Sequence, residues 1–270
     1  MKKSESLTRS ISGSIYIALL VGSTYFSETS FYIIFGIFLF IVSNEYCKVV
    51  KLTKYSKAVP LFNVLIFNLF CFANIPTIII NSTLIVSISF ILYGIYFLFK
   101  IKKERLNLFQ KNFFNLGYII FPFIFLVKIP FLSNQFTPFA IIGVFILIWV
   151  NDTFAYIVGK NFGKNKLFES VSPKKTIEGF LGGLFFTIIF AFILSISFKF
   201  FTFENWFIIG LLVSIFGTLG DLFESKLKRI AKIKDSGNIM PGHGGLLDRL
   251  DSVIFVAPIV YLYLKLYYVS

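Results

Sequence analysis

Long apolar runs, separated by breaks rich in lysine and arginine, constrain this chain more than any other feature. Of its 270 residues, 57% are hydrophobic and only 14% are charged, and the mean hydropathy is +0.83. A water-soluble domain carries about 25% charged residues. Because so little polar surface is available to cover a soluble globule, lipid is the expected solvent for most of the chain.

The apolar runs predict an all-α, polytopic integral membrane protein with about nine transmembrane helices. The runs are continuously apolar and do not alternate, which argues against a β-barrel. No small-residue cleavage site follows the first run, so we expect it to be retained. The predicted helices cover roughly residues 14–27, 30–46, 59–74, 78–99, 113–132, 138–158, 179–199, 205–221 and 252–268.

We expect one continuous membrane domain with two parts. Residues 1–135 supply the N-terminal transmembrane helices, and residues 136–270 form a C-terminal catalytic region. The two longest polar breaks, 159–178 and 222–251, both lie in the second part and are predicted to be cytoplasmic loops. Function is therefore expected in these two breaks.

The basic residues follow the positive-inside rule. If the N-terminus is cytoplasmic, alternate breaks on that side hold all of the 26 basic residues except Lys128, Lys199 and Lys265. This bias predicts a multi-pass protein of the cell membrane, with both long breaks at the cytoplasmic face. It also explains the net charge of +13 without a nucleic-acid partner.

The few cysteine and histidine residues restrict the kind of metal site. Cys47 and Cys71 lie in unlike contexts, and His243 is the one histidine of the sequence. A structural zinc site needs more ligands of these types. Any bound metal must be held mainly by oxygen atoms, which points to Mg²⁺ or a similar hard cation.

Three carboxylates bracket the second long break at the ends of two predicted spans. Asp221 closes the eighth span, and Asp248 and Asp251 open the ninth on one helix face. Charges at the edge of the hydrocarbon need partners. A divalent cation bound by these oxygens would supply one, so the three residues are the predicted metal ligands.

The same break also supplies cations and glycines. Lys228, Arg229 and Lys234 can neutralise a polyphosphate, while Gly244 and Gly245 allow main-chain N–H groups to approach phosphate oxygens. Carboxylates for a metal, basic residues and a glycine-rich turn together indicate phosphoryl or nucleotidyl transfer.

Each of these features also has an ordinary structural explanation. Asp248 and Asp251 fit the acidic start of a helix, and His243 alone fits an ordinary polar residue. Glu224 and Lys228, four residues apart, are expected to form a surface ion pair. The order and spacing of all the features together is what chance does not explain.

That order carries a specific resemblance. Over residues 150–252 the sequence resembles the phosphatidate cytidylyltransferase (CDP-diacylglycerol synthase) family, departing from it at Met240, where an apolar side chain is kept. The stretch that carries the resemblance reads Ser225-x-Leu227-Lys228-Arg229-x₄-Lys234-Asp235-x-Gly237-x₂-Met240-Pro241-x-His243-Gly244-Gly245-Leu246-x-Asp248-Arg249-Leu250-Asp251.

The first long break resembles the same family at both its ends. Asp152-Thr153-x-Ala155-Tyr156 closes the sixth span, and Ser172-Pro173-Lys174-Lys175-Thr176 precedes the seventh. Ser172 and Pro173 alone would be explained as a helix cap and a first helical residue. Lys174, Lys175 and Thr176 would then lie at a helix N-terminus, where they can contact phosphate. Asp152 is expected in the polar site.

The resemblance implies that CTP and phosphatidate react to give CDP-diacylglycerol and diphosphate. It also implies Mg²⁺, a second cation such as K⁺, and a homodimer. Asp221, Asp248, Asp251 and His243 would be catalytic. The implied substrate-binding residues are Asp152, Ser172, Lys174, Lys175, Thr176, Ser225, Lys228, Arg229, Lys234, Gly244, Gly245 and Arg249.

Two other functions remain open at this point. A CTP-dependent polyprenol or phytol kinase would also act on a lipid, but it would release CDP. A transporter of a phosphorylated solute would need charged or broken helices near the middle of the membrane. The predicted acids lie at span ends instead, which favours the enzyme.

Overall fold

The computed structural model describes residues 2–52, 57–100, 106–133 and 135–269, and these residues are almost entirely helical. The first half contains α1 (Lys2–Phe26), α2 (Glu28–Val49), α3 (Ala58–Phe72) and α4 (Thr77–Phe99). A longer helical segment follows, made of α5 (Leu108–Phe114), the π-helical turn η2 (Asn115–Ile120), α6 (Phe121–Lys128) and the 3₁₀ turn η3 (Ile129–Phe131). The all-α prediction is confirmed.

The second half contains four longer helices and one small hairpin. The helices are α7 (Pro138–Phe162), α8 (Ile177–Ser197), α9 (Phe203–Ala231) and α10 (Leu247–Val269). Between α7 and α8, the antiparallel strands β1 (Lys166–Phe168) and β2 (Ser172–Thr176) pair Lys166 with Thr176 and Phe168 with Ser172. The helices α7, α8, α9 and α10 pack against one another in chain order.

A membrane protein is the architecture that these helices support. Among the described residues, seven helical segments are long and apolar enough to cross a bilayer. The shorter apolar helices Ser10–Phe26 and Ala58–Phe72 fall below that length. The polytopic fold is therefore confirmed, whereas the count of nine crossings is not.

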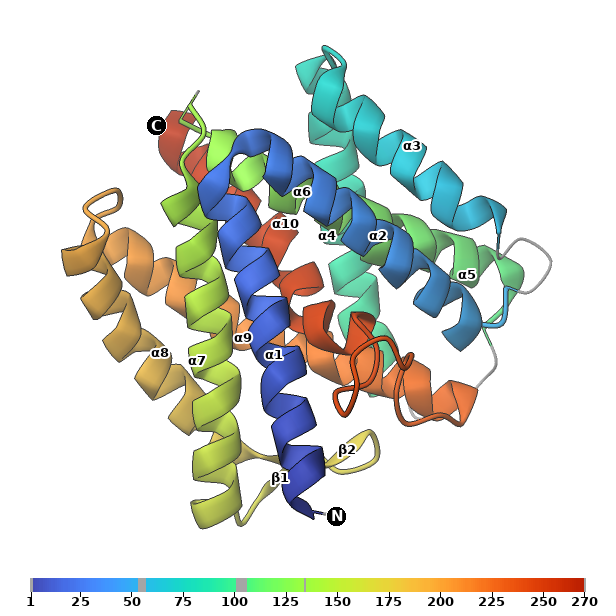
Figure 1. Ribbon diagram of the computed structural model, residues 1–270, viewed down its shortest axis with the longest axis vertical. Helices are drawn as coiled ribbons and strands as arrows, with labels where there is room; N and C mark the ends of the chain where they lie inside the picture. Colours follow the sequence, from blue (N-terminus) through green and yellow to red (C-terminus); the bar gives the residue numbers. More distant parts are fainter. Residues whose placement is uncertain (1, 53–56, 101–105, 134, 270) are drawn as a thin grey trace.

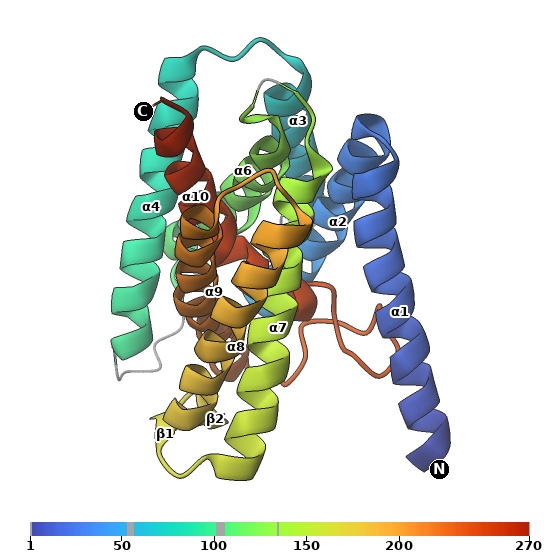
Figure 2. The same cartoon turned by 90° about the vertical axis from the view of Figure 1, so that its left-hand side faces the viewer.

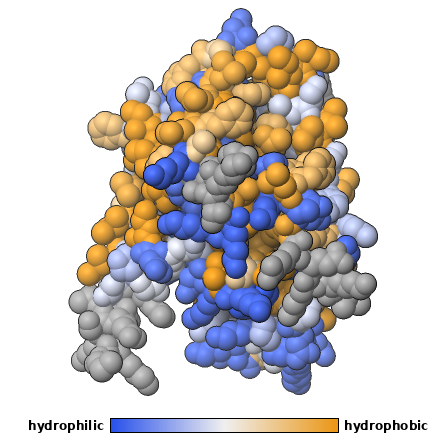
Figure 3. Space-filling view, turned by 90° about the vertical axis from the view of Figure 1, so that its right-hand side faces the viewer, coloured by the Kyte–Doolittle hydropathy of each residue, from blue (hydrophilic) through white to orange (hydrophobic). Residues whose placement is uncertain are grey.

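The helix ends separate into two groups. The N-terminus and the β1–β2 hairpin lie at one end of the molecule, and the C-terminus and the α1–α2 and α3–α4 turns lie at the other (Figures 1 and 2). In a space-filling view, hydrophilic residues gather mostly toward the end that carries the N-terminus, and apolar residues dominate the other end (Figure 3).

Two of the predicted loop boundaries are wrong. The break 159–178 is not a plain loop, because it contains the hairpin. The helix α9 does not stop at Asp221 but continues to Ala231, so the connecting segment is 232–246 and not 222–251. The prediction ended the helix at Asp221 because charged residues follow it. Apolar residues at helical spacing continue beyond it, however, and among them Phe223 and Leu227 are buried.

An aromatic cluster fixes α9 at the depth where the polar site begins. The Phe223 ring is fully buried and contacts the rings of Phe114, Tyr118 and Phe255, with centroid distances of 5.3, 4.9 and 5.4 Å. Offset and edge-to-face ring pairs of this kind add to the stability that burial provides. Phe223 packs α9 against η2 and α10, and this packing positions the neighbouring acids Asp221 and Glu224.

The helices α9 and α10 approach each other closely at Gly220. A Cβ atom at this position would lie 2.5 Å from the main-chain oxygen of Asp251. Small residues allow helix backbones to approach one another in this way. The close approach brings Asp221 of α9 and Asp251 of α10 to the same region of the protein.

Candidate active site

One cavity has carboxylates from α7, α9, α10 and the segment 232–246 on its walls. It has a volume of about 560 Å³ and lies between α1, α7, α9, α10 and the segment 232–246. Its basic residues are Lys228 and Arg249. The carboxylates that line it are Asp152, Asp221, Asp235, Asp248 and Asp251. The structure therefore brings the three predicted metal ligands together, with Asp152 beside them.

Asp221 is paired with a lysine from the hairpin. The Nζ atom of Lys175 on β2 lies 2.6 Å from Oδ2 of Asp221. The Ser225 hydroxyl donates a hydrogen bond to Oδ1 of the same carboxylate, at 3.2 Å. Burial lowers the pKa of Lys175, but attraction to Asp221 outweighs it and leaves the pKa raised. Lys175 is therefore a cation that ties the hairpin to α9.

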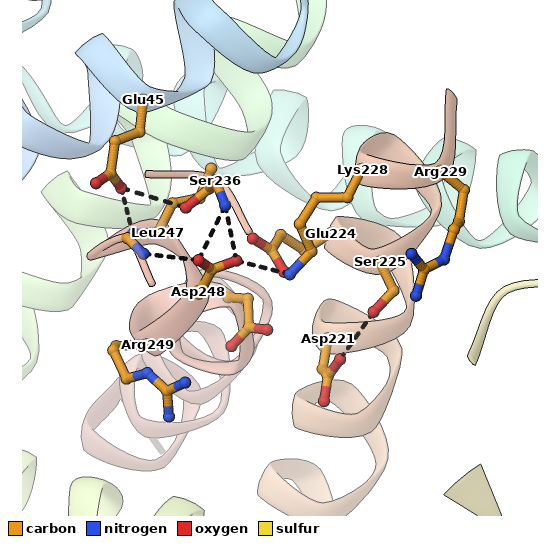
Figure 4. A network of polar contacts seen from close by, with 12 residues as sticks. Glu45, Asp221, Glu224, Ser225, Lys228, Arg229, Ser236, Leu247, Asp248 and Arg249 are labelled. Atoms are coloured by element: carbon orange, nitrogen blue, oxygen red, sulfur yellow. Dashed lines mark hydrogen bonds and ion pairs between the residues drawn. The ribbon is translucent and has the colours of Figure 1, made fainter. Parts of the chain in front are cut away.

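Asp248 accepts hydrogen bonds that close the segment 232–246 (Figure 4). The main-chain N–H groups of Ser236 and Gly245 donate to its carboxylate at 2.9 and 2.7 Å. Lys228 Nζ lies 2.6 Å from Oδ1. Asp248 therefore accepts hydrogen bonds at the start of α10 and is also a predicted metal ligand. The metal role stays a prediction.

Glu224 is buried and Lys228 is only 14% exposed, so the ion pair forms but the prediction that it lies at the surface is wrong. The Glu224 side chain is 1% exposed, and its Oε2 atom lies 2.5 Å from Lys228 Nζ. Lys228 thereby bridges Glu224 and Asp248 (Figure 4). The physical reason is the extension of α9, which turns this face of the helix toward the core. Lys228 is held rigidly at the edge of the cavity.

Asp152 and Asp251 have fewer stabilising contacts than Asp248. Asp251 is buried and accepts a hydrogen bond from the main-chain N–H of Ser252 at 2.7 Å. Asp152 faces the cavity and has a 3.4 Å hydrogen bond from the Asn151 amide. Asp152, Asp221 and Asp251 repel one another electrostatically. This repulsion is the kind that a bound cation relieves.

The donor chemistry fits a hard divalent cation. No group of three or more His, Cys, Asp or Glu side chains within the described parts of the chain is already arranged around a common metal position. The cavity nevertheless has five carboxylates against two basic side chains on its walls. Oxygen ligands and an excess of negative charge are what Mg²⁺ or a similar ion prefers. Asp221, Asp251 and Asp248 could hold it.

The glycine-rich turn shapes the site around Asp248. Gly244 has a φ of 89°, and a Cβ atom there would lie 2.5 Å from Oδ2 of Asp248. A Cβ at Gly245 would lie 2.2 Å from the Ser236 hydroxyl. Because the Gly245 N–H already donates to Asp248, these glycines are needed for the close packing around a carboxylate.

His243 and Arg249 lie where the turn meets α1. The Ser12 hydroxyl and His243 Nδ1 form a hydrogen bond at 2.7 Å, and the Arg249 guanidinium donates to the His243 main-chain oxygen at 3.0 Å. Both His243 and Arg249 line the cavity. The predicted site therefore includes a wall from α1, which lies far from it in the sequence.

The motif Ser172–Thr176 of the first long break forms a strand where the start of a helix was expected. Ser172 and Pro173 belong to β2, and the helix α8 begins at Ile177. Thr176 is the N-cap, because its hydroxyl accepts a hydrogen bond from Gly179 N at 3.1 Å. The helix-cap explanation of Ser172 and Pro173 is therefore wrong. Lys174 and Lys175 therefore lie on the strand β2 and not in the first turn of a helix.

The motif lines a second cavity, of about 490 Å³, beside the hairpin. Lys174, Lys175 and Thr176 are among its lining residues. Ser172 lies in the strand but is not on the wall of either cavity. The predicted substrate-binding residues that line a cavity therefore form two groups, which meet at the Lys175–Asp221 pair.

Six predicted substrate-binding residues lie on neither cavity wall: Ser172, Ser225, Arg229, Lys234, Gly244 and Gly245. The Arg229 guanidinium donates a hydrogen bond to the main-chain oxygen of Val171, in the turn of the hairpin, at 3.4 Å. Lys234 is exposed on the segment 232–246. Ser225 contributes through its hydrogen bond to Asp221. The roles of these six residues in substrate binding remain predictions.

Comparison with known sequences shows to which protein family the chain belongs. Residues 7–267 match the sequence profile of the Cytidylyltransferase family. The chain belongs to this family. It is 43% identical to the phosphatidate cytidylyltransferase of Aquifex aeolicus over 171 residues, which cover 63% of this chain and 62% of that protein.

Other members of the family match over shorter stretches. The phosphatidate cytidylyltransferase of Staphylococcus aureus (strain COL) is 49% identical over 122 residues, 44% of this chain and 46% of that protein. The Bacillus subtilis (strain 168) protein of the same name is 48% identical over 123 residues, 45% of this chain and 46% of that protein. The matches thus span between about half and three fifths of these relatives.

One residue that the sequence analysis overlooked supports the site of this family member from outside the matching motif. Glu45, at the end of α2, accepts hydrogen bonds from the main-chain N–H groups of Leu246 and Leu247 at 3.1 and 2.8 Å. The Ser236 hydroxyl donates to it at 3.4 Å (Figure 4). An acid inside an apolar run was the signal that could have revealed it.

A buried lysine was also overlooked. Lys226 donates hydrogen bonds to the main-chain oxygens of Phe97, Leu98 and Lys100 at the end of α4. Its charge satisfies carbonyl groups that the end of a helix leaves without partners. Lys226 therefore ties α4 to α9 and is a structural residue, although it lies within the basic run of the motif.

Proposed function

We propose that this protein is a phosphatidate cytidylyltransferase, which transfers the cytidylyl group of CTP to phosphatidate and produces CDP-diacylglycerol and diphosphate. Family membership and the names of the relatives support the proposal. One observation carries it in the structure. A carboxylate-rich cavity and a lysine-lined cavity meet at the Lys175–Asp221 pair, within a protein made of membrane-spanning helices.

The reaction joins two phosphates. A phosphate oxygen of phosphatidate attacks the α-phosphorus of CTP, a new P–O bond forms, and the bond to the β-phosphate breaks with loss of diphosphate. Lys228 and Arg249 lie on the cavity wall and would contact the triphosphate. His243 lies on the same wall, where it can contact phosphate or carry a proton.

Mg²⁺ is part of the proposal. Asp221, Asp251 and Asp248 would hold it, and a bound divalent ion neutralises charge on the attacking oxygen and on the departing diphosphate. Without a cation, five carboxylates on the cavity wall would repel a triphosphate. A second cation such as K⁺, and a homodimer, complete the proposal and rest on the resemblance to the family.

The position in the membrane follows from the distribution of charge. The N-terminus and the hairpin lie at one end, toward which hydrophilic residues gather (Figures 2 and 3). Together with the alternation of basic breaks in the sequence, this supports a cytoplasmic N-terminus and an active site at the cytoplasmic face of the cell membrane. There, a lipid phosphate at headgroup depth can meet CTP from the cytoplasm.

Product analysis tests the function. The purified protein in detergent receives Mg²⁺, phosphatidate and CTP labelled at the α-phosphate. We expect labelled CDP-lipid and one diphosphate per lipid product, with activity strongly reduced in Asp221→Asn. Glu204→Gln, at the opposite end of α9 and exposed, is the matched control. Release of CDP without a CDP-lipid would show the lipid kinase instead.

A further inference from the structure

The second cavity has the composition of a phosphate site. It lies between the end of α7, the hairpin and the start of α8, at the end of the molecule that carries the N-terminus (Figure 2). Four lysines line it, and among the described residues no carboxylate does. They are Lys160, Lys166, Lys174 and Lys175. An anion with more than one negative charge is the ligand that such a wall favours.

An apolar groove continues from this cavity. The groove has a volume of about 190 Å³, and its lining residues Leu167, Phe180 and Thr218 also line the lysine cavity. Its lining also includes Phe99, which is 64% exposed, and Ile215, which is 42% exposed. A site with a cationic head and an adjoining apolar groove matches a molecule that has a phosphate at one end and a hydrocarbon chain at the other.

The lysine cavity also lies at the right depth for a lipid headgroup. Tyr156, on its wall, is 67% exposed near the end of the spanning helix α7, and Lys160 Nζ lies 5.9 Å above its ring. Exposed tyrosines at helix ends are typical of the membrane interface. The carboxylate cavity differs from it, because its lining residues include none of those of the apolar groove.

We propose that the lysine cavity binds the phosphate of phosphatidate and the apolar groove holds the start of an acyl chain, so that CTP is left to the carboxylate cavity. This assignment rests on the proposed function and names the place of each substrate. Lys175 marks the junction, because it lines the lysine cavity while its Nζ lies 2.6 Å from Asp221 of the other. A lipid phosphate at Lys175 lies next to the nucleotide whose α-phosphorus it attacks.

Lysine substitutions with steady-state kinetics test the assignment. Lys166→Gln and Lys174→Gln each remove one charge from the wall, and both side chains are exposed, so folding is expected to be preserved. Loss of one charge-assisted contact raises the KM for phosphatidate about tenfold, with the KM for CTP changed less than about twofold. Lys164→Gln, an exposed lysine of the same connection that does not line the cavity, is the matched control.

Competitors separate a lipid site from a free-phosphate site. Dihexanoyl phosphatidate should compete with long-chain phosphatidate far better than inorganic phosphate does, because only the lipid uses the groove. A photoreactive phosphatidate should label peptides from residues 160–181 in the wild-type protein. Labelling needs no turnover, so it also reports on any variant that is inactive.

The outcomes distinguish the two proposals. If the wild-type protein forms no CDP-lipid, the proposed function fails. If it does form CDP-lipid but the lysine variants raise the KM for CTP alone, or leave both constants unchanged, the assignment of the lysine cavity is overturned. Equal competition by inorganic phosphate would overturn the role of the apolar groove.

Discussion

Glu45 provides the most informative perturbation, because it supports the active site from a helix outside the recognisable motif. Replacing it in Glu45→Ala leaves two buried main-chain N–H groups, those of Leu246 and Leu247, without their acceptor. It also removes the partner of the Ser236 hydroxyl. These three donors hold the start of α10 and the segment before it, which together place Asp248.

The expected magnitude follows from the lost hydrogen bonds. A buried donor left without an acceptor costs about 1–3 kcal/mol, so two of them reduce the local stability by about 2–6 kcal/mol. The lower bound corresponds to about a thirty-fold change in an opening equilibrium. The start of α10 should therefore open much more often, while helices that do not contact it stay protected.

Hydrogen exchange followed by mass spectrometry measures this opening. In Glu45→Ala, amide protection should fall at least about thirty-fold in peptides covering 236–250 and change little in α8. Turnover should fall with it, because Asp248 loses its fixed position. Glu28→Ala, an exposed acid in the first turn of the same helix, is the control and should cost less than about 1 kcal/mol. Equal protection in the two variants would refute the positioning role of Glu45.

Three further predictions concern packing and charge. Gly220→Ala places a Cβ 2.5 Å from the Asp251 main-chain oxygen and should lower the free energy of unfolding by about 1–3 kcal/mol. Gly22→Ala, where the Cβ meets nothing within 4 Å, should not, and equal melting of the two variants would contradict the close approach. Lys226→Met removes the lysine donor from three carbonyls at the end of α4, so the thermal midpoint in detergent should fall by the equivalent of about 2–4 kcal/mol; an unchanged midpoint would exclude this role. Lys175→Gln should lower kcat/KM at least about tenfold and Lys175→Arg should lower it less, whereas normal kinetics in Lys175→Gln would show that the pair with Asp221 is dispensable.

The sequence predicted the helices well because lipid imposes a simple rule. Every spanning backbone must satisfy its own hydrogen bonds, so each long apolar run becomes a helix. The ends of the helices were predicted less well. The helix α9 continues for ten residues past Asp221, where Leu222, Phe223 and Leu227 are buried together with the charged residues Glu224 and Lys226. A boundary drawn at the first charge overlooks the buried residues beyond it.

The site was predicted as a set of residues but not as a geometry. Asp152, Asp221, Asp248 and Asp251 do share one cavity, as their positions near span ends suggested. The division into two cavities depends on the hairpin, whose short strands have no alternating apolar pattern. Contacts across some 200 residues, such as that of Glu45 with the start of α10, follow from helix packing that periodicity alone does not specify.

The central claim is that the carboxylate cavity accepts CTP only with a divalent cation. Equilibrium binding of CTP to the lipid-free protein, with Mg²⁺ and with excess EDTA, measures this directly. We predict binding at least about tenfold tighter with Mg²⁺ in the wild-type protein, and a much smaller ratio in Asp221→Asn, where one repelling charge is gone. Equal affinity of the wild-type protein in Mg²⁺ and in EDTA would contradict the account.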